Sequence, residues 1–249
     1  MNERKTIRTR HFPYKSPKFG TKHKPAPMSA WRNTVYYWWW AYLKRNDEYI
    51  ACCQSGGKGR LAQTYADFGD VRGDDFKAWW TFKVGSEERG AYLFAEPSVE
   101  SSVRVLTPGE RAPNDDEVLT VSLPLKFPKR FLERRLKELL TLAHQGKRGV
   151  QLARTSKAKY RFKGQPNIPA LEQGLLVYDA LRAAEGSKPK KPHWVIAEEL
   201  KIVELKNRVS KSDTVQDAYD KKNKMTATVG RYKKRVKNAI EKAATNFFP

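Results

Sequence analysis

The sequence predicts a mostly helical α+β fold, with a small antiparallel sheet in the middle of the chain and helix-turn-helix-like helices at the C-terminal end. Apolar side chains recur at helical spacing in several segments, most clearly over residues 129–144 and 214–245. Short β-like runs occur only in the middle, between residues 91 and 123. Seven Trp, 11 Tyr and 11 Phe among 249 residues supply the core, because each ring can bury roughly 150–250 Å².

The composition of the first 28 residues predicts a basic disordered arm. They carry eight Lys and Arg against one acid, Glu3, together with four prolines and no periodic apolar pattern. Such a segment cannot bury enough apolar surface to order itself. An arm of this kind can follow a phosphate backbone or enter a minor groove, and the alternative is a solubilising tail.

Residues 29–185 predict an aromatic-rich α+β body. Ser29 is a good N-cap for a helix that runs to about Arg45. A second helix is expected from residue 73 to 83, with Asp74 and Asp75 near its positively polarised N-terminus. Three β-like runs then predict a sheet of two or three strands, separated by turns that contain Pro and Gly. These runs are Ala91–Ala95, Ser102–Leu106 and Val118–Leu123.

The second half of the chain predicts mainly helices. The Gly, Pro and Lys of residues 186–192 indicate a linker, which places a boundary before a basic helical C-terminal subdomain at residues 193–249. The expected helices are Lys129–His144, Pro169–Ala184, His193–Val203 and Thr214–Thr245.

Charge is the strongest functional signal. Lys and Arg number 49 against 27 Asp and Glu, which gives a net charge of +22. Such an excess attracts polyanions, and nucleic acid is the partner that such a surface binds most readily, because neutralised phosphates release counterions.

Other classes of protein are disfavoured. The two cysteines, Cys52 and Cys53, are adjacent and form no CxxC pair, so we expect no zinc site and no cofactor. No secretory signal is visible, and the aromatic run Val35–Tyr42 is too short to span a bilayer. These features predict a cytoplasmic protein without a membrane partner.

The C-terminal helices are the first candidate interface. Trp194–Leu200 resembles the first helix of a helix-turn-helix unit, and residues 226–237 would form the recognition helix. The connection of about twenty residues is longer than the usual three or four. Base reading, phosphate contact alone, and a packed amphipathic helix with solvated lysines all remain open.

A basic stretch that carries aromatics is the second candidate. Tyr160 and Phe162 share one side of a predicted strand, with cations on the other. This pattern is typical of a β-ribbon or a stacking platform for single strands, although buried rings and solvated cations are favoured. The predicted nucleic-acid-binding residues are Lys147, Arg148, Arg154, Lys157, Lys159, Arg161, Lys163, Lys224, Thr226, Thr228, Arg231, Lys233, Lys234 and Lys237.

An acidic cluster suggests a third, catalytic hypothesis. Asp67, Asp70, Asp74 and Asp75 precede Lys77, and such carboxylates can hold Mg²⁺ beside a lysine in a nuclease. Helix capping and charge balance explain the same residues, so we expect no enzyme activity and no metal.

The run Trp40-Ala-Tyr-Leu-Lys-Arg-Asn-Asp-Glu-Tyr49 resembles the signature of small transcriptional-regulator-like proteins of bacterial integrative and conjugative elements. The resemblance covers this run and an upstream Trp31. It implies DNA-associated regulation on a mobile element and assigns no binding residue.

Together these features predict a non-catalytic DNA-binding regulator or an accessory subunit of a nucleoprotein complex. The alternatives are an RNA-binding scaffold subunit of a ribonucleoprotein and a Mg-dependent nuclease. The expected partners are DNA, or RNA in its place, and other subunits of the assembly. We expect the pair Arg231→Ala and Lys234→Ala to weaken binding more than two changes within residues 1–28.

Overall fold

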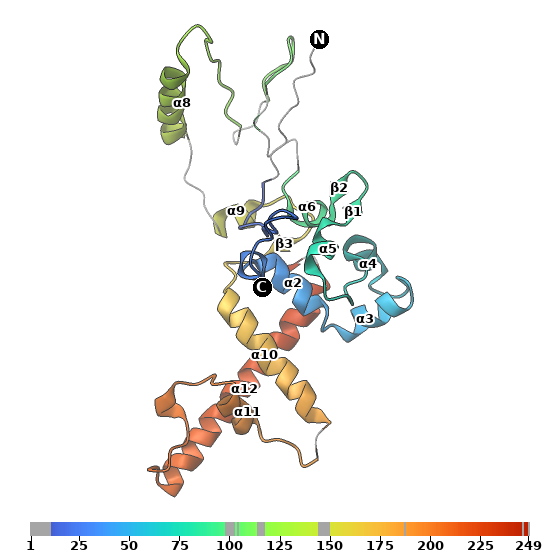
Figure 1. The fold of residues 1–249 in the computed structure, drawn as a ribbon, viewed down its shortest axis with the longest axis vertical. Helices are drawn as coiled ribbons and strands as arrows, with labels where there is room; N and C mark the ends of the chain where they lie inside the picture. Colours follow the sequence, from blue (N-terminus) through green and yellow to red (C-terminus); the bar gives the residue numbers. More distant parts are fainter. Residues whose placement is uncertain are drawn as a thin grey trace.

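The computed structural model describes residues 11–97, 103, 105–113, 118–143, 150–186, 188–245 and 247–248. Its helices and strands surround an aromatic core and continue into a helical extension (Figure 1). The N-terminal elements are α1 (Ser29–Arg32), α2 (Val35–Leu43), α3 (Asp47–Gln54), α4 (Ala62–Phe68), α5 (Phe76–Thr81), β1 (Lys83–Val84), β2 (Glu87–Glu88) and α6 (Arg89–Phe94). The later elements are α8 (Lys129–Ala143), α9 (Val150–Thr155), β3 (Arg161–Phe162), α10 (Ile168–Glu185), α11 (His193–Glu199), the 3₁₀ turn η1 (Leu205–Asn207), α12 (Val215–Ala243) and β4 (Phe247–Phe248).

Helix α2 is the centre of the aromatic core. All of its residues except Tyr37 are buried, so neighbours cover it on every side. Trp39 has no exposed surface, and its ring lies 5.2 Å from Phe94 and 5.1 Å from Phe162. The predicted helix from Ser29 to Arg45 is split, because Asn33 and Thr34 interrupt it between α1 and α2.

A second, mainly aliphatic core joins α10, α11 and α12. Val177, Ile196, Met225 and Val229 are almost fully buried there. Both α10 and α12 extend from this core to the aromatic one, as Figure 1 shows. The helices before and after the predicted linker at residues 186–192 therefore pack together in a shared core.

The end of the chain closes the aromatic core. Trp39 Nε1 donates to the carbonyl of Ala243 at 2.8 Å, and the ring of Phe248 stacks on Trp39 at 5.2 Å. Strand β4 pairs in parallel with β3, with Arg161 opposite Phe247. These contacts fix the C-terminal half of α12 to the body.

The mostly helical α+β class is confirmed, but its sheet lies elsewhere than predicted. The antiparallel pair joins β1 and β2, with Lys83 opposite Glu88. All of the run Ala91–Ala95 except Ala95 is helical and belongs to α6, because Leu93 and Phe94 reach the aromatic core from a single helical turn. Val118–Leu123 is irregular and pairs with no described strand, and Ser102–Leu106 is only partly described.

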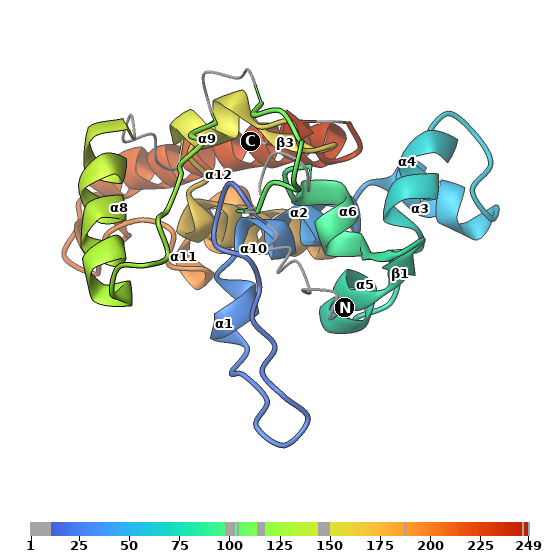
Figure 2. The same cartoon turned by 90° about the horizontal axis from the view of Figure 1, so that it is seen from above.

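Much of the predicted arm is packed. Phe12, Tyr14 and Phe19 contact the aromatic core, and the Tyr14 hydroxyl donates to the Gly164 carbonyl at 2.7 Å. The prediction of disorder is therefore wrong for these residues, while residues 1–10 lie outside the described chain. The turn between Phe19 and Ala26 projects from the body beside α1 (Figure 2).

Helix α8 confirms the prediction of a helix near residues 129–144, but its apolar face is uncovered. None of its residues is buried, and Leu142 is 85 % exposed. The helix stands apart from the two cores (Figure 1). Within the described ranges, every helix is too short or too polar to span a lipid bilayer.

Candidate nucleic-acid interface

Helix α12 is the longest element and carries most of the candidate residues. It begins with a capping box, in which Thr214 and Asp217 satisfy each other's backbone N–H groups. Its 29 residues extend over roughly 43 Å. Met225, Val229 and Val236 lie on the buried face, and the opposite face of the helix is exposed to solvent.

The exposed surface of this helix is strongly cationic. Residues 221–240 contain eight Lys and Arg and no acid. Helical geometry, at about 100° per residue, places the cations on the two sides of the buried face, which we call flanks, and opposite to it, which we call the crest. Lys234 lies at the crest, about 180° from Met225.

One flank forms a row of cations that we call the ridge: Lys224, Arg231, Arg235 and Lys242. Their directions agree within about 40°, and the row extends over roughly 27 Å. All four residues are exposed, and no ion pair involves them in the described part of the chain. Arg231 Nη2 donates to Thr228 Oγ1 at 3.1 Å, and this hydroxyl donates to the Lys224 carbonyl. The ridge is therefore a continuous cationic surface with one oriented guanidinium.

The other flank faces the neighbouring helices. Lys233 lies 3.6 Å from Glu185 of α10, and the Lys222 ammonium lies 4.7 Å from the ring of Trp194 in α11. Thr226 and Lys237 share this side and are exposed. The sequence-predicted residues on α12 are thus distributed around the helix rather than gathered on one side.

The sequence analysis missed two members of the ridge, Arg235 and Lys242. They lie 11 and 18 residues after Lys224, which is three and five turns of an α-helix. A helical projection of residues 215–243 contains this signal, whereas the predicted recognition helix of residues 226–237 includes Arg235 but ends before Lys242.

The basic stretch after α9 has buried rings and an exposed cationic side. Tyr160 and Phe162 are each 3 % exposed, which confirms the favoured interpretation of the aromatics. Lys159 is partly exposed, but its ammonium contacts Asp67 at 2.5 Å and the Tyr92 hydroxyl at 2.6 Å. Lys159 therefore completes a structural network.

The other cations of this stretch have different surroundings. Arg154, Lys157 and Lys163 are exposed, and the guanidinium of Arg161 lies 5.2 Å from the ring of Phe247. Because β3 pairs with β4, Arg161 lies near the C-terminal end of α12. Lys147 and Arg148 lie outside the described residues.

The acidic cluster does not form a metal site in the described part of the chain, where no three His, Cys, Asp or Glu side chains converge. Asp74 contacts Lys44 at 2.5 Å, and this hydrogen bond lowers the pKa of the Asp74 carboxyl. Asp75 caps α5, and Asp67 accepts from the Tyr160 hydroxyl at 2.8 Å. Arg72 binds Asp70 through its guanidinium, which lowers the pKa of that carboxyl.

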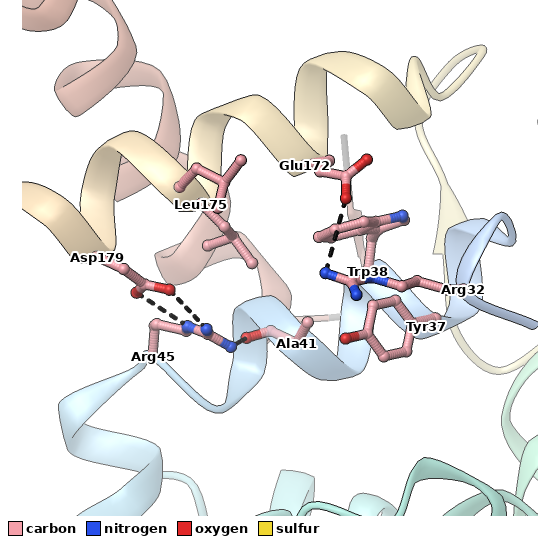
Figure 3. A pocket seen from close by; sticks show the side chains of 9 residues that line it. Arg32, Tyr37, Trp38, Ala41, Arg45, Glu172, Leu175 and Asp179 are labelled. Carbon is pink, nitrogen blue, oxygen red and sulfur yellow. Dashed lines mark hydrogen bonds and ion pairs between the residues drawn. The ribbon is translucent and has the colours of Figure 1, made fainter. Parts of the chain in front are cut away.

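A small cavity of about 70 Å³ lies between α2 and α10 (Figure 3). Arg45 binds Asp179 through two hydrogen bonds of 3.2 and 2.7 Å, and Arg32 lies 3.6 Å from Glu172. Each cation of the cavity thus faces an acid from the opposite helix. These ion pairs link α10 to the segment that contains α1 and α2, and the cavity leaves little room for a ligand.

Comparison with known proteins found no matching family model, no similar curated protein and no similar solved structure.

Proposed function

We propose that this chain is a non-catalytic nucleic-acid-binding protein that contacts a duplex DNA backbone through the ridge on α12. The observation that carries the proposal is the row of exposed cations, which have no carboxylate partner among the described residues and are held on a helix whose other side is buried. Fixed cations bind a polyanion better than mobile ones, because less conformational freedom is lost on binding.

The dimensions of the ridge suit a phosphate backbone. Phosphates of one DNA strand are spaced about 3.4 Å apart along the helix axis, so a row of roughly 27 Å meets several of them. Each phosphate that a lysine or arginine neutralises releases condensed counterions. Such contacts set the position of a protein on DNA without reading the sequence.

Residues 40–49 bear on the role of the protein once it is bound to DNA. The resemblance of residues 40–49 to regulator-like proteins of mobile elements favours a DNA-associated regulator or an accessory subunit of a nucleoprotein complex. Those residues contribute a structural role, because Tyr49 is buried and its hydroxyl donates to the Gly69 carbonyl at 2.7 Å. Contacts to DNA are assigned to α12 alone.

Binding of the full chain to one duplex across a series of salt concentrations tests the proposal. Replacing Arg231 and Arg235 by Ala should reduce the slope of log K against log salt by about 0.9 for each lost phosphate contact. The matched control replaces Arg60 and Lys206, which are exposed but already paired with Glu48 and Glu204. Equal slopes for both double variants would contradict the assignment, and tighter binding to RNA of equal length would favour the ribonucleoprotein alternative.

A further inference from the structure

Arg89, at the start of α6, is a half-buried arginine that has no hydrogen-bond acceptor among the described residues. Its Nε is buried and has no hydrogen-bond partner, and no ion pair involves it among the described residues. Buried charges in proteins are normally paired, because an uncompensated charge loses its hydration. Among the other half-buried arginines of the described chain, Arg45 binds Asp179, and Arg208 donates to the carbonyls of Val203 and Lys201. The Nε of Arg32 is also buried without a hydrogen-bond partner, but its guanidinium lies 3.6 Å from the carboxylate of Glu172.

Aromatic rings and a glycine hold this guanidinium in place. Its central carbon lies 4.4 Å from the ring centre of Phe82 and 6.0 Å from that of Trp79. A Cβ on Gly69 would lie 2.6 Å from Arg89 Nη2, so the guanidinium packs directly against the backbone at this glycine. These contacts fix the orientation of the group without neutralising its charge.

No carboxylate of the described residues compensates the charge of Arg89. Burial lowers the pKa of Arg89, and the groups that act in the opposite direction are the hydroxyls of Tyr49 and Tyr65. Arginine nevertheless stays charged at neutral pH, because its ordinary pKa is above 12. The half-buried charge therefore lacks a counterion within the described chain.

We propose that Arg89 and Phe82 form a binding site for a nucleotide phosphoryl group, with the guanidinium on the phosphate and the ring against the base. Only the Nε of this guanidinium is among its buried atoms, and the Nη atoms have no partner in the described part of the chain, so they are the end that a ligand can reach. The planar fork of arginine matches the oxygens of a phosphate. Phe82 is 56 % exposed, so part of its surface remains open for stacking of a base.

The site is separate from the ridge, and its phosphate has two possible sources. A terminal or single-stranded nucleotide of a bound nucleic acid would supply it together with a base, and a free mononucleotide would supply it from solution. The test therefore uses small probes without any duplex, so that its failure is distinguishable from a failure of the ridge.

Calorimetric titration of the full chain with inorganic phosphate, adenosine monophosphate, and a single-stranded oligonucleotide with or without a 5′-phosphate tests the site. We expect Arg89→Met to lose at least tenfold in affinity for each phosphorylated probe. The unbranched apolar side chain of Met keeps the packing of the arginine stem but removes the guanidinium. Arg89→Lys, which retains charge but loses the fork, should lose affinity to a smaller extent. Arg60→Met is the matched control and should bind like the wild type.

The contribution of the ring is measured separately. Phe82→Leu should weaken binding of adenosine monophosphate by a larger factor than binding of inorganic phosphate. Both probes lose the ring that orients the guanidinium, but only the nucleotide also loses the stacking of its base. A response to the phosphorylated oligonucleotide alone identifies nucleic acid as the source, and an equal response to the mononucleotide identifies a free nucleotide. If the wild type binds no phosphorylated probe, or if Arg89→Met and Arg89→Lys bind like the wild type, the proposal is wrong.

Discussion

The buried carboxylate of Asp67 offers a test of whether Lys159 is structural. Asp67 is 3 % exposed, and it accepts hydrogen bonds from Lys159 Nζ at 2.5 Å, Tyr160 at 2.8 Å and Tyr92 at 3.0 Å. Replacing Asp67 by Ala leaves the buried Tyr160 hydroxyl without this acceptor, at a cost of about 1–3 kcal/mol. The ion pair adds less than a fully buried one, because the Lys159 side chain is 39 % exposed and can regain water. We expect a total loss of about 2–4 kcal/mol in the free energy of unfolding.

Urea unfolding of the full chain measures this loss. Lys159→Met should also destabilise the fold, by about 1–3 kcal/mol, because it leaves a buried carboxylate with only hydroxyl donors. The same variant should not change the salt slope of duplex binding. The control is Lys129→Met, whose exposed pair with Glu133 should contribute under about 1 kcal/mol. A loss below about 1 kcal/mol for Asp67→Ala would refute the network as a structural element.

Two further predictions concern packing and titration. Gly174→Ala should destabilise the fold by about 1–3 kcal/mol, because its new Cβ would lie 2.8 Å from Val236 Cγ2. Gly230→Ala is the matched change in an exposed helix interior, and it should stabilise the fold by about 1 kcal/mol because its Cβ meets nothing within 4 Å. Thermal or urea unfolding measures both variants. A change in the free energy of unfolding that has the same sign for both would contradict the packing around Gly174. Burial raises the pKa of Tyr36 and Tyr49 well above the ordinary 10.0, so their hydroxyls stay protonated in the folded chain. The contribution of these buried hydroxyls to the free energy of unfolding is complete below pH 10 and falls as the pH rises above it. Ultraviolet absorbance should therefore show that these tyrosines ionise only as the chain unfolds. Full ionisation of all tyrosines near pH 10 in the folded chain would contradict their burial.

The helices were predictable where a single apolar face repeats. Met225, Val229 and Val236 follow the helical period, and the structure buries them on one side of α12. The run at 91–95 was not predictable in the same way, because a short apolar run fits a strand or a helix equally. Its assignment depends on where Leu93 and Phe94 meet the aromatic core, which is a tertiary property.

Long-range contacts account for the other differences. Phe12, Tyr14 and Phe19 anchor the N-terminal segment, although its composition resembles a disordered arm. Phe248 packs on Trp39 more than two hundred residues earlier in the chain, and no local pattern indicates this contact. The candidate site was predicted in part, since cations on α12 follow from the sequence. The ridge becomes visible only when the buried face fixes the orientation of the helix.

Lysine acetylation with and without duplex DNA, followed by mass spectrometry, tests the central claim most directly. The bound duplex should protect Lys224 and Lys242 of the ridge and leave the exposed Lys129 and Lys206 reactive. Equal protection at all four positions, or protection of Lys129 and Lys206 alone, would contradict the assignment of the ridge as the surface that meets DNA.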